Sequence, residues 1–171
     1  MLVYCDTSTL LNNVKKHNDP KTEKELAALL QLLTLRLAGT VKMVRSRVVL
    51  REVDRTGDQA LLMRLRADYE ALDQVPLDEK VVGYHSQFNE RGGVTHPLVE
   101  DVQSPALRDK LAQQGLKRRD AEHITQALAN RCDVFLTRDE RTIIKPHRTW
   151  LEGKLPGLKI RLPSELLAKL K

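Results

Sequence analysis

The stretch Asp120–Asp139 (DAEHITQALANRCDVFLTRD) decides the fold. Its first half has apolar residues on one side of a helix that Asp120 opens. Its second half contains Val134–Thr137, an apolar run of β-forming residues that predicts a buried strand. One residue after this strand comes a second acid, Asp139. A helix, a strand and an acid beyond the strand are typical of a parallel α/β sheet, whose ligands bind beyond the carboxyl ends of the strands.

The same alternation extends outward along the chain. Further strands are expected at Leu2–Cys5, Val41–Val44, Val75–Leu77 and, as an edge strand, Leu158–Leu162. Helices are expected at Thr9–His17, Thr22–Gly39, Ser46–Thr56, from Asp58 through Leu72, and at Asp78–Asn89, Ala106–Gln114, Asp120–Asn130, Glu140–Leu151 and Ser164–Leu170. Arg91–Pro105, with two adjacent glycines, is the best loop candidate. The pattern predicts one α/β domain over residues 1–171, with a parallel sheet covered on both faces.

The helix at Thr22–Gly39 has two features of its own. Thr22 and Glu25 have the spacing of a capping box at its start, and Gly39 lies where a C-terminal cap belongs. Its leucines cover most of the circumference, which predicts burial on more than one side.

Composition and charge restrict the class of protein. The chain has 171 residues, 41% hydrophobic and 30% charged, which fits one globular domain and excludes a fibrous or disordered protein. A net charge of +6 favours a polyanionic partner such as nucleic acid, although an ordinary charged surface gives the same surplus. No apolar run approaches the ~18 residues of a membrane span, and the N-terminus lacks a secretory pattern. We therefore expect a cytoplasmic protein without membrane contact, with Cys5 and Cys132 as buried, reduced thiols.

Four acids are candidates for a functional site. Asp6 and Asp139 follow strands, where an aspartate also serves as a turn or helix cap. Glu52 lies within the apolar stripe of its helix, a costly place for a carboxylate unless it binds a metal or pairs with an arginine. Asp120 opens a helix and is either a ligand or an N-cap, with His123 where a capping box would have Glu or Gln.

Taken together, the acids predict a metal site. Several converging carboxylates repel one another, and a hard cation such as Mg²⁺ or Mn²⁺ relieves that repulsion. Such a metal lowers the pKa of bound water and clamps a phosphate. In a basic chain, this chemistry indicates a metal-dependent nuclease. The five histidines have no zinc-ligand spacing, and His123 is expected to pack or hydrogen-bond near its helix start.

Several stretches, in order along the chain, resemble PIN-domain ribonucleases, among them VapC-type toxins. They are Leu2–Leu11 (LVYCDTSTLL), Ser46–Val53 (SRVVLREV), Asp120–Asp139 and Leu158–Leu167 (LKIRLPSELL). The resemblance implies a three-layer α/β/α sandwich with a central, mostly parallel sheet. It also implies an acidic quartet of Asp6, Glu52, Asp120 and Asp139 that holds Mg²⁺ or Mn²⁺, with Thr7, Ser8 and Thr137 as polar helpers. The chain is longer than the compact toxins around Asn18–Leu37 and Arg91–Leu111.

The predicted function is a metal-dependent endoribonuclease that hydrolyses RNA with activated water. A toxin role would add an antitoxin protein and a second copy of the chain as candidate partners. Candidate phosphate contacts are Arg47, Arg51, Arg55, Arg138 and Arg141. Two alternatives stay open: a non-cleaving RNA-binding or regulatory PIN-like module acting through protein partners, and an interaction protein that docks a partner on the helix Glu23–Ala38.

Overall fold

Five parallel strands form the centre of the molecule in a computed structural model that describes residues 1–10, 20–75, 87–88, 94–95 and 105–170. They are β1 (Leu2–Cys5), β2 (Lys42–Arg45), β3 (Asp73–Gln74), β6 (Val134–Leu136) and β7 (Lys159–Arg161). Their order in the sheet is β3-β2-β1-β6-β7, and every pairing is parallel. Strand β1 is central, and β7 lies at an edge as its alternating sequence predicts. The predicted α/β architecture is confirmed.

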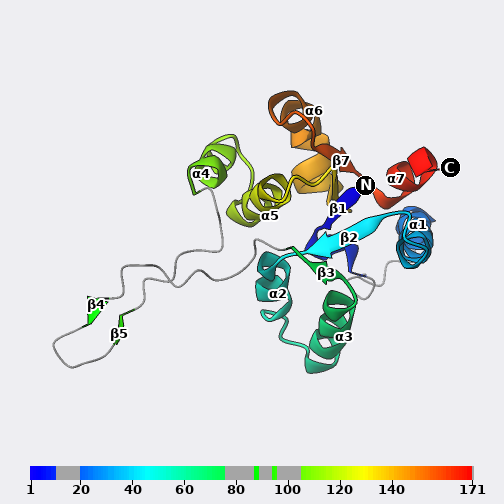
Figure 1. The fold of residues 1–171 in the computed structure, drawn as a ribbon, viewed down its shortest axis with the longest axis horizontal. Coiled ribbons are helices and arrows are strands. Elements are labelled where there is room, and N and C mark those ends of the chain that lie inside the picture. The colour runs from blue at the N-terminus through cyan, green and yellow to red at the C-terminus, as the bar shows by residue number, and fades with distance from the viewer. Residues whose placement is uncertain (11–19, 76–86, 89–93, 96–104, 171) are drawn as a thin grey trace.

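Helices cover both faces of this sheet, which makes the molecule a three-layer sandwich (Figure 1). The helices are α1 (Pro20–Leu37), α2 (Arg47–Val53), α3 (Gln59–Glu70), α4 (Pro105–Gln113), α5 (Arg118–Ala129), α6 (Lys145–Lys154) and α7 (Pro163–Leu170). A 3₁₀ turn, η1 (Thr7–Thr9), follows β1, and a π-helical turn, η2 (Glu140–Ile144), leads into α6.

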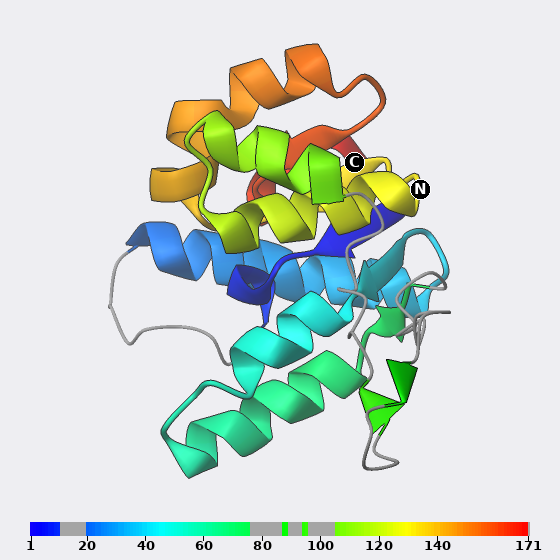
Figure 2. The same ribbon diagram turned by 90° about the vertical axis from the view of Figure 1, so that its left-hand side faces the viewer.

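Alternation along β1 separates two apolar cores. Val3 and Cys5 pack with the buried residues of α1, α3 and α7 on one face. Tyr4 points to the other face, where it packs with residues of α5, η2 and α6. Helix α4 packs on the outside of α5, as Figure 2 shows. Cys5 and Cys132 are buried free thiols, as expected, and burial raises the pKa of each to about 12.

Helix α1 differs from its sequence prediction in two respects. Thr22 lies inside the helix, and Glu25 bonds to Ser164 of α7, so these residues form no capping box. Leu30 and Leu37 are 51% and 81% exposed, because α1 packs on α7 and the sheet along one side only. Gly39 ends the helix as predicted, with a φ of +76° that favours glycine.

The middle of the chain was predicted incorrectly where the structure describes it. Gln87–Phe88 (β4), assigned to a helix, and Val94–Thr95 (β5), assigned to a loop, form an antiparallel pair. Strand β3 lies at Asp73–Gln74, just before the predicted Val75–Leu77. Residues 11–17 of the predicted helix Thr9–His17 lie outside the described residues, as do 18–19 and 76–86. No helix in the described ranges is long and apolar enough to cross a membrane.

Candidate active site

The site begins where the central strands end. Because β1, β2 and β6 are parallel neighbours, Asp6, Ser46 and Thr137, which follow them directly, lie at the same edge of the sheet. Asp6 is buried, with 6% of its surface exposed. A buried carboxylate at this edge needs partners, and the residues around it provide them.

Two predicted polar helpers hold Asp6 in place. The hydroxyls of Ser8 and Thr137 donate to Oδ2 of Asp6 at 2.7 and 2.8 Å. Each hydroxyl also accepts a backbone N–H, Ser8 from Arg138 at 2.9 Å and Thr137 from Asp139 at 3.0 Å. These bonds join η1 to the end of β6 and orient the Asp6 carboxylate toward the neighbouring α2 and α5.

Glu52 and His123 complete a compact group with Asp6. Nε2 of His123 lies 3.2 Å from Oε2 of Glu52 and 3.6 Å from Oδ1 of Asp6. Thr7, the third polar helper, donates from its hydroxyl to Oε2 of Glu52. One ligand atom each from Asp6, Glu52 and His123 lie within 4.8 Å of one another. Strand β1, helix α2 and helix α5 thus bring together two carboxylates and an imidazole.

A buried hydrogen-bond chain orients the His123 ring. The Tyr4 hydroxyl lies 2.9 Å from Nδ1 of His123 and 2.6 Å from Oγ of Ser46, and all three residues are buried. Oγ of Ser46 also accepts the Val48 N–H at 3.2 Å as the N-cap of α2. With Nδ1 held by Tyr4, Nε2 faces the two acids. A polar partner on the second ring nitrogen is typical of metal-ligating histidines.

His123 and Glu52 shift each other's pKa values through their hydrogen bond and their opposite charges. Burial works to lower the pKa of His123, but the hydrogen bond with Glu52 and the charges of Asp6, Glu52 and Asp120 outweigh it, so the pKa is raised. Burial likewise works to raise the pKa of Glu52, yet the hydrogen bond and charge of His123 leave it below its usual value. The nearby acids therefore favour the protonated form of His123, and the imidazolium in turn favours the ionised form of Glu52.

Asp120 and Asp139 form a second pair, joined by Thr142. The Thr142 hydroxyl lies 2.6 Å from Oδ2 of Asp139 and 3.1 Å from Oδ2 of Asp120. The pKa of Asp120 is raised to about 6, chiefly by burial and then by the negative charge of Asp6. Asp6 and Asp120 are therefore near enough to repel, but the second pair lies outside the compact group.

The structure also tests whether each acid serves only as a helix cap or as the partner of an arginine. Lys117 is the N-cap of α5, so Asp120 is not a cap. Asp139 does cap η2, accepting the Thr142 N–H at 2.8 Å. Asp6 occupies the N-cap position of η1 but makes no side-chain cap bond. The hydrogen-bond partners of the Glu52 carboxylate are Thr7 and His123, not the arginine that the alternative explanation required.

Sequence reasoning left His123 out of the site. His123 follows Asp120 by three residues and therefore lies on the same face of α5. This three-residue spacing is the feature of the sequence that could have placed His123 in the site. Tyr4 and Thr142 carried no comparable signal, because their contacts depend on how the sheet and η2 pack.

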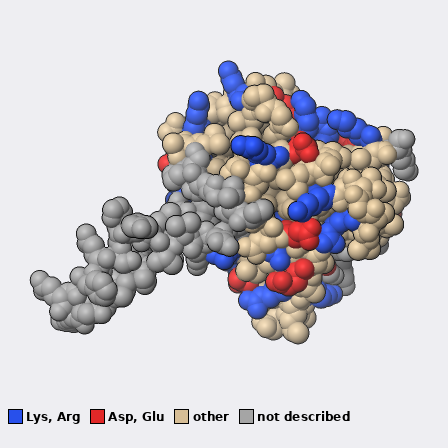
Figure 3. Space-filling view, viewed as in Figure 1, with Lys and Arg blue, Asp and Glu red and all other residues tan. Residues whose placement is uncertain are grey.

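The candidate phosphate contacts have different surroundings. Arg51 and Arg55 line a cleft of about 370 Å³ between α2 and α5, whereas Arg47 does not. Arg138 is half-buried and donates from Nε to the Ser8 carbonyl at 2.5 Å, so it ties η1 to the end of β6. Arg141 is exposed on η2. On the face in Figure 3, basic side chains are spread among acidic ones, so the charge surplus forms no single patch there.

Comparison with known proteins finds no matching family model, no matching curated protein and no matching solved structure. Inference about function therefore depends on the geometry and chemistry of the site itself.

Proposed function

We propose that this protein is a divalent-metal-dependent endoribonuclease whose metal is held by Asp6, Glu52 and His123. The observation that carries this proposal is the meeting of Asp6, Glu52 and His123 ligand atoms within 4.8 Å at the carboxyl edge of the parallel sheet. Ligands of open α/β sheets bind at this edge. The basic net charge and the motif resemblance to PIN domains support RNA as the substrate.

The donor set fits a divalent metal. Carboxylate oxygens suit Mg²⁺ and Mn²⁺ alike, but an imidazole nitrogen is better accepted by Mn²⁺ and other transition metals. We therefore expect activity with Mn²⁺ to exceed activity with Mg²⁺. When bound, such a metal lowers the pKa of water and polarises the scissile phosphate.

The protein's own groups have separate tasks in this proposal. Ser8 and Thr137 fix the Asp6 carboxylate, and Tyr4 fixes the ring of His123. Asp120 can accept a proton from the attacking water, because a carboxyl with a pKa of about 6 is mostly ionised at neutral pH and still basic enough to act. Asp139, bonded to the same threonine, keeps further negative charge at this end of the site.

The test is RNA cleavage by purified protein with Mn²⁺, with Mg²⁺ and with chelator. Asp6→Asn and Glu52→Gln should each reduce cleavage by orders of magnitude, because each removes a charged ligand. Asp58→Asn is the matched control. It makes the same change at the exposed N-cap of α3, where asparagine caps about as well as aspartate, so cleavage should persist. Equal cleavage by wild type and both site variants would contradict the proposal.

A non-cleaving RNA-binding or regulatory module is the second candidate. It is favoured by the hydrogen bonds that Asp6 and Glu52 already make to hydroxyls and to His123, since such a network is satisfied without metal. This candidate predicts RNA binding without cleavage under any metal. The toxin role, an antitoxin partner and a homodimer rest on the motif resemblance and stay predictions.

A further inference from the structure

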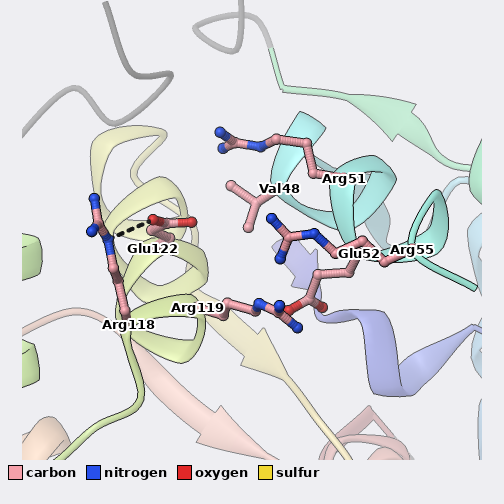
Figure 4. A pocket seen from close by; sticks show the side chains of 7 residues that line it. All are labelled: Val48, Arg51, Glu52, Arg55, Arg118, Arg119 and Glu122. Atoms are coloured by element: carbon pink, nitrogen blue, oxygen red, sulfur yellow. Dashed lines mark ion pairs between the residues drawn. The ribbon is translucent and has the colours of Figure 1, made fainter.

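A charged cleft between α2 and α5 lies beside the group of Asp6, Glu52 and His123. Four arginines line it, Arg51 from α2, Arg55 from the turn that follows α2, and Arg118 and Arg119 from α5, together with Val48, Glu52 and Glu122 (Figure 4). Four positive charges against two negative ones make this cleft attractive to anions. Glu52 belongs both to the cleft and to the group with Asp6 and His123, so the two sites are continuous.

The arginines of the cleft are not equivalent. Arg118 pairs with Glu122 of its own helix at 3.5 Å, the one ion pair marked in Figure 4. Arg55 and Arg119 are exposed and form no ion pair with the described residues. Figure 4 shows them extending into the cleft from opposite sides, with Arg119 directed toward Glu52. Arg119 is near enough to Glu52 to help lower the pKa of that carboxyl.

We propose that this cleft binds the sugar-phosphate backbone of single-stranded RNA next to the scissile phosphate, with Arg55 and Arg119 on either side of one phosphate. The inference rests on the proposed function, because it assigns the strand that the neighbouring acids would cut. Guanidinium groups bind phosphate through paired, charge-assisted hydrogen bonds. Helices α2 and α5 contact each other, and the cleft between them has a volume of about 370 Å³, so we assign it to one strand.

The lining also predicts the specificity of binding. Among the described residues that line it, Val48 is the only apolar one and none is aromatic. This lining gives bases no stacking surface, so affinity should come from phosphate charge. Binding should be strongly salt-dependent and nearly independent of base sequence.

The experiment measures binding of a labelled, mixed-sequence oligoribonucleotide in EDTA over a range of KCl concentrations, so that no cleavage occurs. Arg55→Gln and Arg119→Gln should each flatten the slope of log affinity against log salt by about 0.7, and the double variant by about 1.4. At low salt, the double variant should bind roughly tenfold more weakly. Both side chains are exposed, so the variants should fold like wild type, which thermal unfolding checks.

Arg64→Gln is the matched control. Arg64 is exposed on α3 and does not line the cleft, so its loss should leave the salt slope at the wild-type value. Wild-type affinity and slope in the double variant would overturn the inference, as would absence of RNA binding by the wild type. If the wild type binds RNA with the expected salt slope but no added metal makes it cleave the RNA, the nuclease proposal fails and the cleft assignment stands. If the wild type cleaves RNA with metal but the double variant binds RNA as the wild type does, the nuclease proposal stands and the cleft assignment fails.

Discussion

At the scale of single residues, Asp120 shows how burial and neighbouring acids raise the pKa of a carboxyl group in the site. It is half-buried on α5, near Asp6 and Asp139, with one hydrogen bond from Thr142. Burial and these two negative charges raise its pKa from 3.8 to about 6. The folded protein therefore holds this proton more tightly than the unfolded chain does, and its stability should decrease as Asp120 ionises.

Asp120→Asn should remove that pH dependence. Because a raised acid pKa favours the protonated folded state, the wild type loses stability relative to the variant as the pH rises from about 4 to about 6. Above that window the difference should stay constant, with the metal-free variant at least as stable as wild type. Urea unfolding in EDTA at several pH values gives this difference. A difference that does not change between pH 4 and 7 would contradict the raised pKa.

At the scale of elements, the contact between α1 and α7 ties distant parts of the chain together. Glu25 of α1 is 5% exposed, and its carboxylate accepts the Ser164 N–H at 2.9 Å and the Ser164 hydroxyl at 2.6 Å. An acid from another helix thus satisfies a donor at the free N-terminus of α7. This use of Glu25 explains why its capping-box spacing with Thr22 forms no local cap.

Glu25→Ala should destabilise the protein by about 2 kcal/mol, because it leaves a partly buried N–H of α7 without its charged acceptor. Chemical denaturation should show a lower midpoint with an unchanged m-value. Glu23→Ala is the comparison, since Glu23 is exposed in the first turn of the same helix and should cost less than about 0.5 kcal/mol. Equal effects of the two substitutions would mean that the Ser164 contact contributes nothing.

At the scale of the whole molecule, metal binding should stabilise the fold. The metal-binding group comes from the end of β1, from α2 and from α5, so a cation that Asp6, Glu52 and His123 share binds only when these elements are assembled. At a metal concentration ~100 times the dissociation constant, the gain is about 2.7 kcal/mol. For a chain of this length that is a rise of roughly 5–10 °C in melting temperature.

Thermal unfolding with Mn²⁺ and with EDTA measures this rise. Asp6→Asn should abolish most of it, since Asp6 is the most buried acid of the group. Asp58→Asn, outside the site, should keep it in full. A full metal response in the Asp6 variant would place the metal elsewhere.

The sequence by itself determined the layers of the molecule and which acids follow which strands. Apolar runs and their alternation with helical patterns depend on local burial, so β1, β2, β6 and β7 and the caps at Ser46 and Asp58 were predictable. Two-residue strands such as β4 and β5 carry too few residues for any pattern, and they were missed.

Tertiary structure alone decided how the acids are grouped. The strand order places β1 between β2 and β6, and this order brings Glu52 of α2 and His123 of α5 to either side of Asp6. The same packing leaves Asp120 and Asp139 as a separate pair through Thr142, and it opens the arginine-lined cleft. Spacing along the chain reports which face of one element a residue occupies, whereas distances between elements depend on how the two cores pack around the sheet.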